Sequence, residues 1–471
     1  MFRSFRLGRL CSAVLACAMM SPAAQAAPLD TATAGRIDAD VAVALGRREV
    51  PGAVIEIILD GEPVYRKAYG LRDLERRLPA EIGTRYEIGS ITKQFTAAAI
   101  LQLRAAGKLD IDLKLATYLP AAPHAREVTL RQLLSHTSGL HEYFDDALAS
   151  QPIGYDALIA RIADLPLDFP PGSRFSYSNT GYMLLGRVIE TLSGETYHDY
   201  LEHKIFGPLG MTRTATMVEE AGLDNMAVGY RHQQGKLELA PPLSAGWGGA
   251  AGMIVGTLDD LARWDAALSG GKVVSAADYA EMTVPFKLTG GAGADYGLGL
   301  FVDSAFDQPR IGHTGGALGY TTADEFFPKQ GVRIIAFTNS GDATPEAGEV
   351  LTNLVFQNLY PDLAAAALAP AAGEESSATD SVRAAFVELQ AGAGYAHFAS
   401  SLAAKLANGA GRRLSDSLAP YGAPTGFVFR GRRDSEDGPW YDYLAEFGPG
   451  AMLKFAVRLD DKRKVRNIDL G

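Results

Sequence analysis

A serine and a lysine that stand three positions apart, Ser90 and Lys93, are residue types whose spacing permits nucleophilic chemistry. A serine hydroxyl is a poor nucleophile without an adjacent base, and a lysine can be that base when its surroundings lower its pKa. The apolar residues around them have helical spacing, so we expect Ser90 at the N-terminal end of a helix and Lys93 one turn away on the same side. The free N–H groups of such a helix end favour an oxyanion. An isolated match to this short pattern would instead be a capping serine beside a surface lysine.

A second group, Tyr177-Ser178-Asn179, follows a Pro-Pro-Gly turn and precedes an apolar helical segment at 182–189. A tyrosine in a loop just ahead of a helix can present its phenol to a cleft, where it can exchange protons if a nearby ammonium lowers its pKa. Asn179 can hold a ligand carbonyl or orient the lysine. Taken alone, the same residues also fit a packed tyrosine followed by helix-capping side chains.

A third group, His313-Thr314-Gly315-Gly316, lies among the last strands expected before residue 340. Two consecutive glycines allow a ligand to approach the strand backbone closely. An exposed N–H group here, together with that of Ser90, would supply two donors to an oxyanion. The alternative for this group alone is a glycine-rich bend that carries an incidental histidine.

The three groups stand in the order and rough spacing of a known set of motifs, S-x-x-K, Tyr-x-Asn and Lys/His-Thr-Gly. On these motifs the sequence resembles the serine β-lactamase and penicillin-binding-protein superfamily. It is most similar to the branch that contains class C β-lactamases, DD-carboxypeptidases and esterases. The resemblance runs from about residue 37 to residue 360, and further matching stretches lie at 133–140, 171–172, 256–264 and 296–299.

The resemblance implies a role for each matching residue. Ser90 would attack a carbonyl carbon and form an acyl-enzyme, while Lys93 and Tyr177 would share the proton transfers. Asn179 would help to position these groups or the substrate. The predicted activity is therefore that of a serine hydrolase acting on an ester, a D-amino-acid peptide or a related amide.

The third motif would line the cleft with His313, Thr314 and Gly315, and the N–H groups of Gly316 and Ser90 would form the oxyanion hole. His313 departs from many β-lactamases, which place a lysine there. A lysine is a permanent cation suited to a substrate carboxylate, whereas a histidine ordinarily titrates near neutrality. This departure favours a peptidase or an esterase over an efficient β-lactamase.

Three alternatives remain open at the level of the sequence. The protein could be a peptidoglycan DD-carboxypeptidase or penicillin-binding protein, or a weak β-lactamase. From another class, it could be a non-catalytic binding protein that retains the fold. The intact set Ser90, Lys93, Tyr177 and Asn179 argues against the non-catalytic reading, because the loss of catalysis leaves such a set free to drift.

The elements that must position these groups predict an α/β (α+β) fold of the β-lactamase/transpeptidase type. The start and end of the main region supply strands, whereas its middle is mostly helical by periodicity. We therefore expect an antiparallel sheet flanked by helices, with an inserted helical lobe. The expected strands are at 53–59, 64–69, 297–302, 321–327 and 332–339, with helices at 29–48 and 345–359.

Four segments follow from this reading along the chain of 471 residues. Residues 1–26 resemble a signal peptide, because arginines precede a short apolar stretch and a small-x-small cleavage site. Residues 29–360 form the hydrolase domain, and the Ala-, Pro-, Glu- and Ser-rich residues 361–380 read as a linker. Residues 381–471 read as a small α+β accessory domain.

The signal peptide predicts a secreted or periplasmic protein after cleavage. Lipid attachment at Cys17 is a minor alternative, since the residues before it loosely resemble a lipobox. Both cysteines, Cys11 and Cys17, precede the cleavage site, so the mature chain would have neither a disulfide nor a catalytic thiol. No later segment is long and apolar enough for a transmembrane helix.

No cofactor or metal is expected from the sequence. His198 and His203 are five apart on a predicted helix and diverge, and His136 and His141 lack a third ligand nearby. The formal net charge of −11 argues against a nucleic-acid partner, which would require clustered Lys and Arg. The expected partner is a small-molecule or peptide substrate, derived in one reading from the cell wall, and the oligomeric state stays open.

Overall fold

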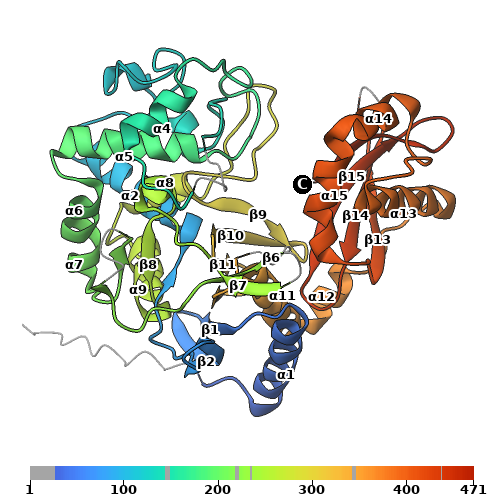
Figure 1. Cartoon of the computed structure of the whole chain (residues 1–471), viewed down its shortest axis with the longest axis horizontal. Helices are drawn as coiled ribbons and strands as arrows, with labels where there is room; N and C mark the ends of the chain where they lie inside the picture. The colour runs from blue at the N-terminus through green and yellow to red at the C-terminus, as the bar shows by residue number, and fades with distance from the viewer. Residues whose placement is uncertain are drawn as a thin grey trace, which may run out of the picture.

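A computed structural model describes residues 27–143, 149–217, 222–233, 236–341, 346–435 and 438–470. The predicted signal peptide, with Cys11 and Cys17, lies outside the described residues. In Figure 1 a larger part, drawn from blue through yellow to light orange, lies beside a smaller C-terminal part drawn in darker orange and red. No helix in the described part of the chain is long and apolar enough to cross a membrane.

The larger part is built on a seven-stranded antiparallel sheet in the order β3-β2-β1-β12-β11-β10-β9. The first strands of the chain thus pair with the last, since β1 lies directly beside β12. This confirms the antiparallel sheet expected from strands at both ends of the region. The strands are β1 (Gly52–Leu59), β2 (Glu62–Asp73), β3 (Leu78–Pro79), β9 (Phe301–Ala305), β10 (Gln308–Ala317), β11 (Tyr320–Phe327) and β12 (Val332–Thr338).

Alternating side chains of β1 serve two separate cores, because successive residues of a strand point to opposite faces of its sheet. Ala53, Ile55 and Ile57 pack with helices α1 (Thr31–Arg47) and α11 (Ala347–Leu359) on one face. Val54 belongs to the larger core on the other face, where the helical lobe lies. The near-continuous apolar run of β1 therefore reflects a strand that is covered on both sides.

The helical lobe lies between β3 and β9 in the sequence and places α2 and α5 against each other. Short strands β4 (Tyr86–Glu87), β5 (Ala215–Thr216) and β8 (Ile254–Gly256) form a second sheet, and β6 (Tyr230–Gln233) pairs with β7 (Lys236–Leu239). The helices of the lobe are η1 (Gly89–Ile91), α2 (Thr92–Ala105), η2 (Leu115–Thr117), α3 (Leu130–Leu134), α4 (Tyr155–Ile162), α5 (Asn179–Ser193), α6 (Tyr197–Leu201), η3 (Glu202–Phe206), α7 (Gly207–Leu209), α8 (Ala245–Gly252), α9 (Leu258–Ser269) and α10 (Ala276–Met282).

One expected strand is displaced along the chain. The pattern at 297–302 predicts a strand, but β9 begins only at Phe301 and continues to Ala305. Gly299 has φ +79°, and a Cβ there would lie 2.8 Å from the Lys93 carbonyl oxygen. The chain therefore turns at Gly299 to pass close to α2, and it enters the sheet two residues later.

A buried ionic network fixes α2 to the sheet. Arg333 on β12 lies between the carboxylates of Asp324 on β11 and Asp265 on α9, with 3.1 Å to Asp265. Asp324 also accepts a hydrogen bond of 3.1 Å from Gln94 on α2, and Gln94 in turn accepts one from the Trp264 indole. These contacts hold the helix that carries Lys93 at a defined place above the sheet.

Replacement of Arg333 by methionine is expected to destabilise the protein strongly. Two carboxylates would be left buried without their cation, and breaking a buried pair in this way typically costs about 3–5 kcal/mol. Denaturant unfolding followed by tryptophan fluorescence measures this loss. The matched control is Arg433→Met, which breaks a largely exposed pair with Asp442 and should cost less than about 1 kcal/mol. Equal stability of the two variants would contradict the network's role.

The C-terminal part has its own core and a four-stranded antiparallel sheet in the order β13-β14-β15-β16. It docks on the larger part through α11, where Asn353 donates a hydrogen bond of 3.2 Å to the Gly450 carbonyl. Its elements are α13 (Ser376–Ala391), α14 (Ser400–Lys405), η5 (Leu406–Ala410), α15 (Gly411–Leu418), η6 (Ala419–Tyr421), β13 (Gly426–Arg433), β14 (Trp440–Glu446), β15 (Met452–Leu459) and β16 (Val465–Asp469).

The linker expected at 361–380 is wrong in extent. Residues Pro361–Ala367 form helix α12, and α13 begins at Ser376, so only the residues between them connect the two parts without a helix. Pro361 stands at the first helical position, where a missing N–H costs nothing. Ala364 and Ala367 are buried against the α1–α11 core, which explains why an alanine-rich stretch folds here.

Candidate active site

Ser90 and Lys93 lie side by side at the start of α2, as their spacing predicts. Ser90 is the middle residue of the 3₁₀ turn η1, and α2 begins two residues later. Gly89, just before Ser90, has φ +52°, a conformation that side chains other than glycine rarely adopt. This sharp turn brings the serine out of the short strand β4 and onto the end of the helix.

The Lys93 amine is fully buried and faces three oxygen atoms. It lies 2.9 Å from Ser90 Oγ, 2.8 Å from Asn179 Oδ1 and 2.8 Å from the Ala251 carbonyl on α8. Burial lowers its pKa from 10.5 to about 7, while the Glu142 carboxylate acts in the opposite direction. A neutral amine donates two hydrogen bonds and has one lone pair. Asn179 Oδ1 and the Ala251 carbonyl oxygen can accept the two hydrogen bonds, while the lone pair accepts the Ser90 proton.

Tyr177 lies above the amine, in the loop that leads into α5. The Lys93 Nζ is 4.8 Å from the centre of its ring, and the Ser90 hydroxyl forms a hydrogen bond with its phenol. The condition set for proton exchange, an ammonium that lowers the phenol pKa, is not met. Burial raises the pKa of Tyr177 well above 10, because the phenolate would lose its hydration. Tyr177 is thus a neutral hydroxyl at neutral pH, able to donate a proton in a hydrogen bond.

His136, a residue of the 133–140 stretch, packs against the loop that carries Tyr177 and Ser178. Its ring packs 4.2 Å from the Tyr177 ring, centre to centre, and its Nδ1 accepts a hydrogen bond of 3.1 Å from the Ser178 N–H. Burial and the nearby Lys93 charge hold the pKa of His136 well below 6.5. A neutral imidazole therefore fixes the loop without adding charge to the site.

Asn179 joins two parts of the site at the first turn of α5. Its side chain accepts a hydrogen bond from Lys93, as described above, and its backbone N–H donates one of 2.5 Å to Glu142 Oε2. The negative carboxylate thus lies at a helix N-terminus, where it is favoured, and close enough to Lys93 to stabilise its ammonium form. The sequence predicts Asn179 but gives no signal for Glu142, which comes from an irregular loop.

Strand β10 closes the other side of the site with the third motif. Gly315 is buried, and a Cβ there would lie 2.0 Å from the Ile88 carbonyl oxygen. A Cβ on Gly89 would lie 2.8 Å from the Gly316 nitrogen, so the turn before Ser90 touches the Gly316 peptide. The two glycines therefore permit a backbone contact that brings the Ser90 and Gly316 peptides together. Thr314 is partly exposed between His313 and Gly315.

His313 does not titrate near neutrality, contrary to the expectation from its residue type. Its Nδ1 lies 2.5 Å from the Thr314 carbonyl oxygen and its Nε2 lies 2.9 Å from the Tyr296 hydroxyl. Burial and the Lys93 charge lower its pKa to about 3. The residue is neutral under physiological conditions, and it offers no cation to a substrate carboxylate.

The fold thus brings together all three sequence motifs around one point. Further residues join them that sequence reasoning misses: Glu142, Tyr296 and Glu346. Tyr296 lies within a stretch, 296–299, that the resemblance already marks, and that match is the available signal for it. Glu346, which precedes α11, forms a hydrogen bond with Thr314. Its carboxyl comes from a part of the chain without any motif.

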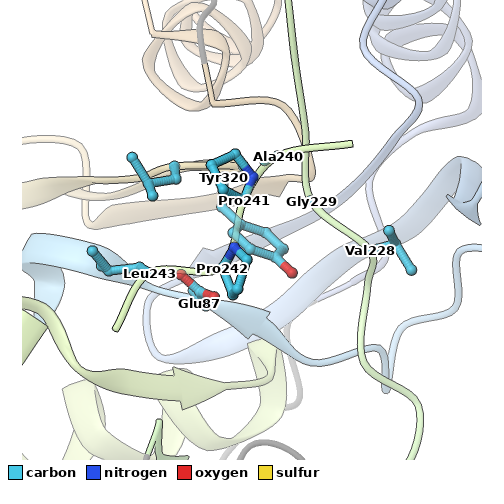
Figure 2. A pocket seen from close by; sticks show the side chains of 10 residues that line it. Glu87, Val228, Gly229, Ala240, Pro241, Pro242, Leu243 and Tyr320 are labelled. Atoms are coloured by element: carbon cyan, nitrogen blue, oxygen red, sulfur yellow. The ribbon is translucent and has the colours of Figure 1, made fainter. Parts of the chain in front are cut away.

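A cavity of about 170 Å³ lies between the β10–β11 turn and the segment 240–243. Figure 2 shows the side chains that line it. Glu87 and Tyr320 line it, together with apolar residues, whereas Ser90 and Lys93 do not. Within the described ranges, no three His, Cys, Asp or Glu side chains gather so as to hold a metal ion. The arrangement around Ser90 can instead activate a hydroxyl and transfer its proton.

Comparisons with known proteins identify the family of this chain. A family model described as Beta-lactamase matches residues 36–358. Penicillin-binding protein 4 of Amycolatopsis lactamdurans is 32% identical over 329 residues, which cover 63% of this chain and 82% of that protein. A D-aminopeptidase of Brucella anthropi is 29% identical over 312 residues, 64% of this chain, and this chain spans 59% of its length.

Solved structures are similar over comparable regions. A D-stereospecific amidohydrolase from a Streptomyces species has 28% identity and a TM-score of 0.57, over 66% of this chain and 95% of that one. An octameric penicillin-binding protein homologue from Pyrococcus abyssi has 25% identity and a TM-score of 0.61, over 93% of this chain and 98% of that one. The family model matches more than half of this chain. The chain therefore belongs to the Beta-lactamase family and is a serine hydrolase.

Proposed function

We propose that the protein is an exported amidohydrolase or peptidase that forms an acyl-enzyme on Ser90 and releases D-amino acids from amides, short peptides or related esters. The observation that carries this proposal is the buried Lys93 amine, 2.9 Å from Ser90 Oγ, whose pKa is lowered to about 7. A base with a pKa close to the working pH is the most effective for proton transfer. Export rests on the sequence pattern of residues 1–26.

In the acylation step, the neutral Lys93 amine takes the Ser90 proton as Oγ attacks the substrate carbonyl carbon. The negative oxygen that results would be held by the N–H groups of Ser90 and Gly316, whose peptides lie together. Each such donor is typically worth about 3 kcal/mol in the transition state. The leaving nitrogen must gain a proton before the C–N bond breaks. Tyr177, a neutral phenol hydrogen-bonded to Ser90, is placed to pass it the proton now held by Lys93.

Deacylation repeats these steps with water as the nucleophile. Water loses its proton to the Lys93 amine and attacks the ester carbonyl, and Ser90 Oγ recovers a proton as the acid product leaves. Asn179 would keep the amine aligned in both steps through its hydrogen bond of 2.8 Å. No redox agent or metal is needed for this sequence of steps.

The pH dependence of kcat/KM is a direct prediction of this mechanism. Lys93 acts as a base only without its proton, so kcat/KM for a substrate without a carboxylate should rise as the pH increases through about 7 and should level off above it. His313, with a pKa of about 3, and Tyr177, with a pKa above 10, should not contribute between pH 5 and pH 9. A profile that falls over pH 6–8 would show that the ammonium form is the active one.

Two observations support D-amino-acid amides as the substrate class. Several relatives are named D-aminopeptidases, and structural relatives include a D-stereospecific amidohydrolase. His313 is neutral, so it supplies no cation to a β-lactam or peptide carboxylate. The test compares release of ammonia from D-alaninamide and L-alaninamide. Hydrolysis of the D-form, lost in Ser90→Ala, is expected; a preference for the L-form would overturn this substrate class.

The similarity to penicillin-binding protein 4 favours one other function, a peptidoglycan DD-carboxypeptidase or penicillin-binding protein. A fluorescent penicillin that labels Ser90 and persists for hours would support that function. Rapid release of hydrolysed penicillin would instead support a β-lactamase.

A further inference from the structure

Glu346 places a carboxyl group on the edge of the candidate active site. It lies immediately before α11, and its Oε1 is 3.8 Å from the position that a Cβ on Gly316 would occupy. The Thr314 side chain forms a hydrogen bond with the carboxyl. Its other oxygen, Oε2, is buried and has no hydrogen-bond partner among the described residues. The carboxyl therefore lies beside the strand segment Thr314–Gly316, on the strand that faces Ser90.

The groups around Glu346 do not neutralise it. Glu349 stands one turn further along α11 and raises the pKa of Glu346, as burial does more strongly, to about 7. The nearest guanidinium on the strand, Arg310 of β10, already binds Asp303 at 2.7 Å, Glu325 at 2.6 Å and Glu349 at 3.2 Å. One cation is thus shared among three carboxylates.

Among the described residues, two tyrosines also interact with the Glu346 charge. The Glu346 charge contributes to the raised pKa of Tyr177, and likewise to the raised pKa of Tyr421 on η6 in the C-terminal part. Arg48 is a cation close to Tyr421, and burial lowers its pKa. His313 is neutral, as described above. On this side of Ser90, an acidic group thus lies beside Thr314 and Gly316 of β10.

We infer that Glu346 determines substrate specificity by excluding substrates with a carboxylate beside Thr314, so that neutral amides and esters are preferred. Two like charges in a partly buried site repel each other, and such repulsion is a common means of rejecting a wrong ligand. This inference deepens the proposed function and rests on the acyl-enzyme at Ser90 that it includes. It assigns the enzyme to neutral amides rather than to peptides that end in a carboxylate at this position.

A pair of probes that differ only in the carboxylate tests the inference. Benzylpenicillin and its methyl ester would each acylate Ser90, and intact-mass spectrometry at pH 8.5 gives the second-order acylation rates. We expect the wild-type protein to prefer the ester by on the order of tenfold or more, as a charge repulsion across a partly solvated site implies. Glu346→Gln should bring the two rates within about threefold of each other, mainly by speeding the reaction of benzylpenicillin.

Glu349→Gln is the matched control, because it removes an equal charge from the same helix one turn away without touching Thr314. It should retain the preference for the ester. The acylation rate with the neutral ester reports whether each variant is folded and active. A wild-type preference for benzylpenicillin, or a Glu346→Gln variant that keeps the full preference for the ester, would overturn the inference.

A second pair separates this inference from the substrate class proposed above. D-alanyl-glycine and D-alanyl-glycine N-methylamide carry a charged and a neutral leaving group, and release of D-alanine is measured for both. The protonation of Lys93 affects both substrates equally, so it cancels in the ratio of their kcat/KM values. The pH dependence of this ratio therefore reports the ionisation of Glu346. The preference for the N-methylamide should grow as the pH rises through about 7. If neither peptide reacts but the penicillin pair behaves as expected, the D-amino-acid proposal fails and the role of Glu346 stands.

Discussion

Replacement of Lys93 by arginine is expected to lower kcat/KM by about 10,000-fold, which is as much as replacement by methionine. A nucleophile and its base depend on each other, so the loss of the base removes nearly all the catalysis that the pair provides. Arginine keeps the positive charge but does not lose its proton at any accessible pH. If Lys93 is the base, both variants lack it. If instead Lys93 acts as a fixed cation, the arginine variant should retain most of the activity.

The control for this comparison is Lys108→Met. Lys108 lies just beyond α2 and donates a hydrogen bond of 3.0 Å to the Leu192 carbonyl at an exposed position. It should keep wild-type kcat/KM. Because Lys93 is buried, each variant needs circular dichroism and thermal unfolding to show that it is folded. An arginine variant that is folded and within tenfold of wild-type activity would contradict the assignment of Lys93 as the base.

Gly89→Ala is the second substitution with a large expected effect. Its φ of +52° strains any other residue, and the new Cβ would meet the Gly316 peptide, 2.6 Å from its oxygen and 2.8 Å from its nitrogen. Either the strand or the turn must move, which separates the Ser90 and Gly316 N–H groups. We expect kcat to fall roughly 100-fold or more, since the loss of one oxyanion donor costs that much. The strained backbone should also lower stability by about 1 kcal/mol or more.

Gly252→Ala provides the matched control in the same region. Gly252 lies in α8, and a Cβ there would come no closer than 3.7 Å to the Gly89 backbone, an ordinary contact. Steady-state kinetics on D-alaninamide and denaturant unfolding compare the two variants. Equal activity in Gly89→Ala and Gly252→Ala would show that the contact between the Ser90 turn and β10 does not contribute to catalysis.

The motifs predict which residues gather around Ser90, because each has a fixed local geometry. A serine and a lysine three apart on a helix lie on one side of it, and this predicts the Ser90–Lys93 contact without a structure. The turn before Tyr177 and the following apolar helix likewise place Asn179 at a helix start. The antiparallel sheet follows from strands at both ends of the domain, and the resemblance to a known family supports that topology.

Ionisation states were not predictable, because they depend on burial that no local pattern encodes. His313 has the residue type of a neutral-pH switch, yet its depth in the fold lowers its pKa to about 3. The pKa of Tyr177 is raised rather than lowered, and the cause is again burial. Glu142 and Glu346 come from segments without periodicity, and only the three-dimensional arrangement of loop and sheet brings their carboxylates to the site.

The segment after residue 360 shows that amino-acid composition alone does not predict whether a stretch folds. The alanine-rich stretch after residue 360 has the composition of a linker, yet α12 forms because Ala364 and Ala367 find a core to pack against. Propensity alone permitted the helix, and the tertiary contact decided it. The pairing of the C-terminal part with α11 depends on the same kind of long-range contact, which lies beyond a reading of local sequence.

The acyl-enzyme on Ser90 is the central claim, and intact-mass spectrometry tests it most directly. Mature protein is exposed briefly to a fluorophosphonate, an activated ester and a penicillin, in parallel with Ser90→Ala. The proposal predicts a mass increase of one acyl or phosphonyl group with at least one probe, located on Ser90 by peptide mapping and absent from the variant. Adducts that form equally in Ser90→Ala, or no adduct with any of the three probes, would contradict the mechanism and favour a non-catalytic binding protein on this fold.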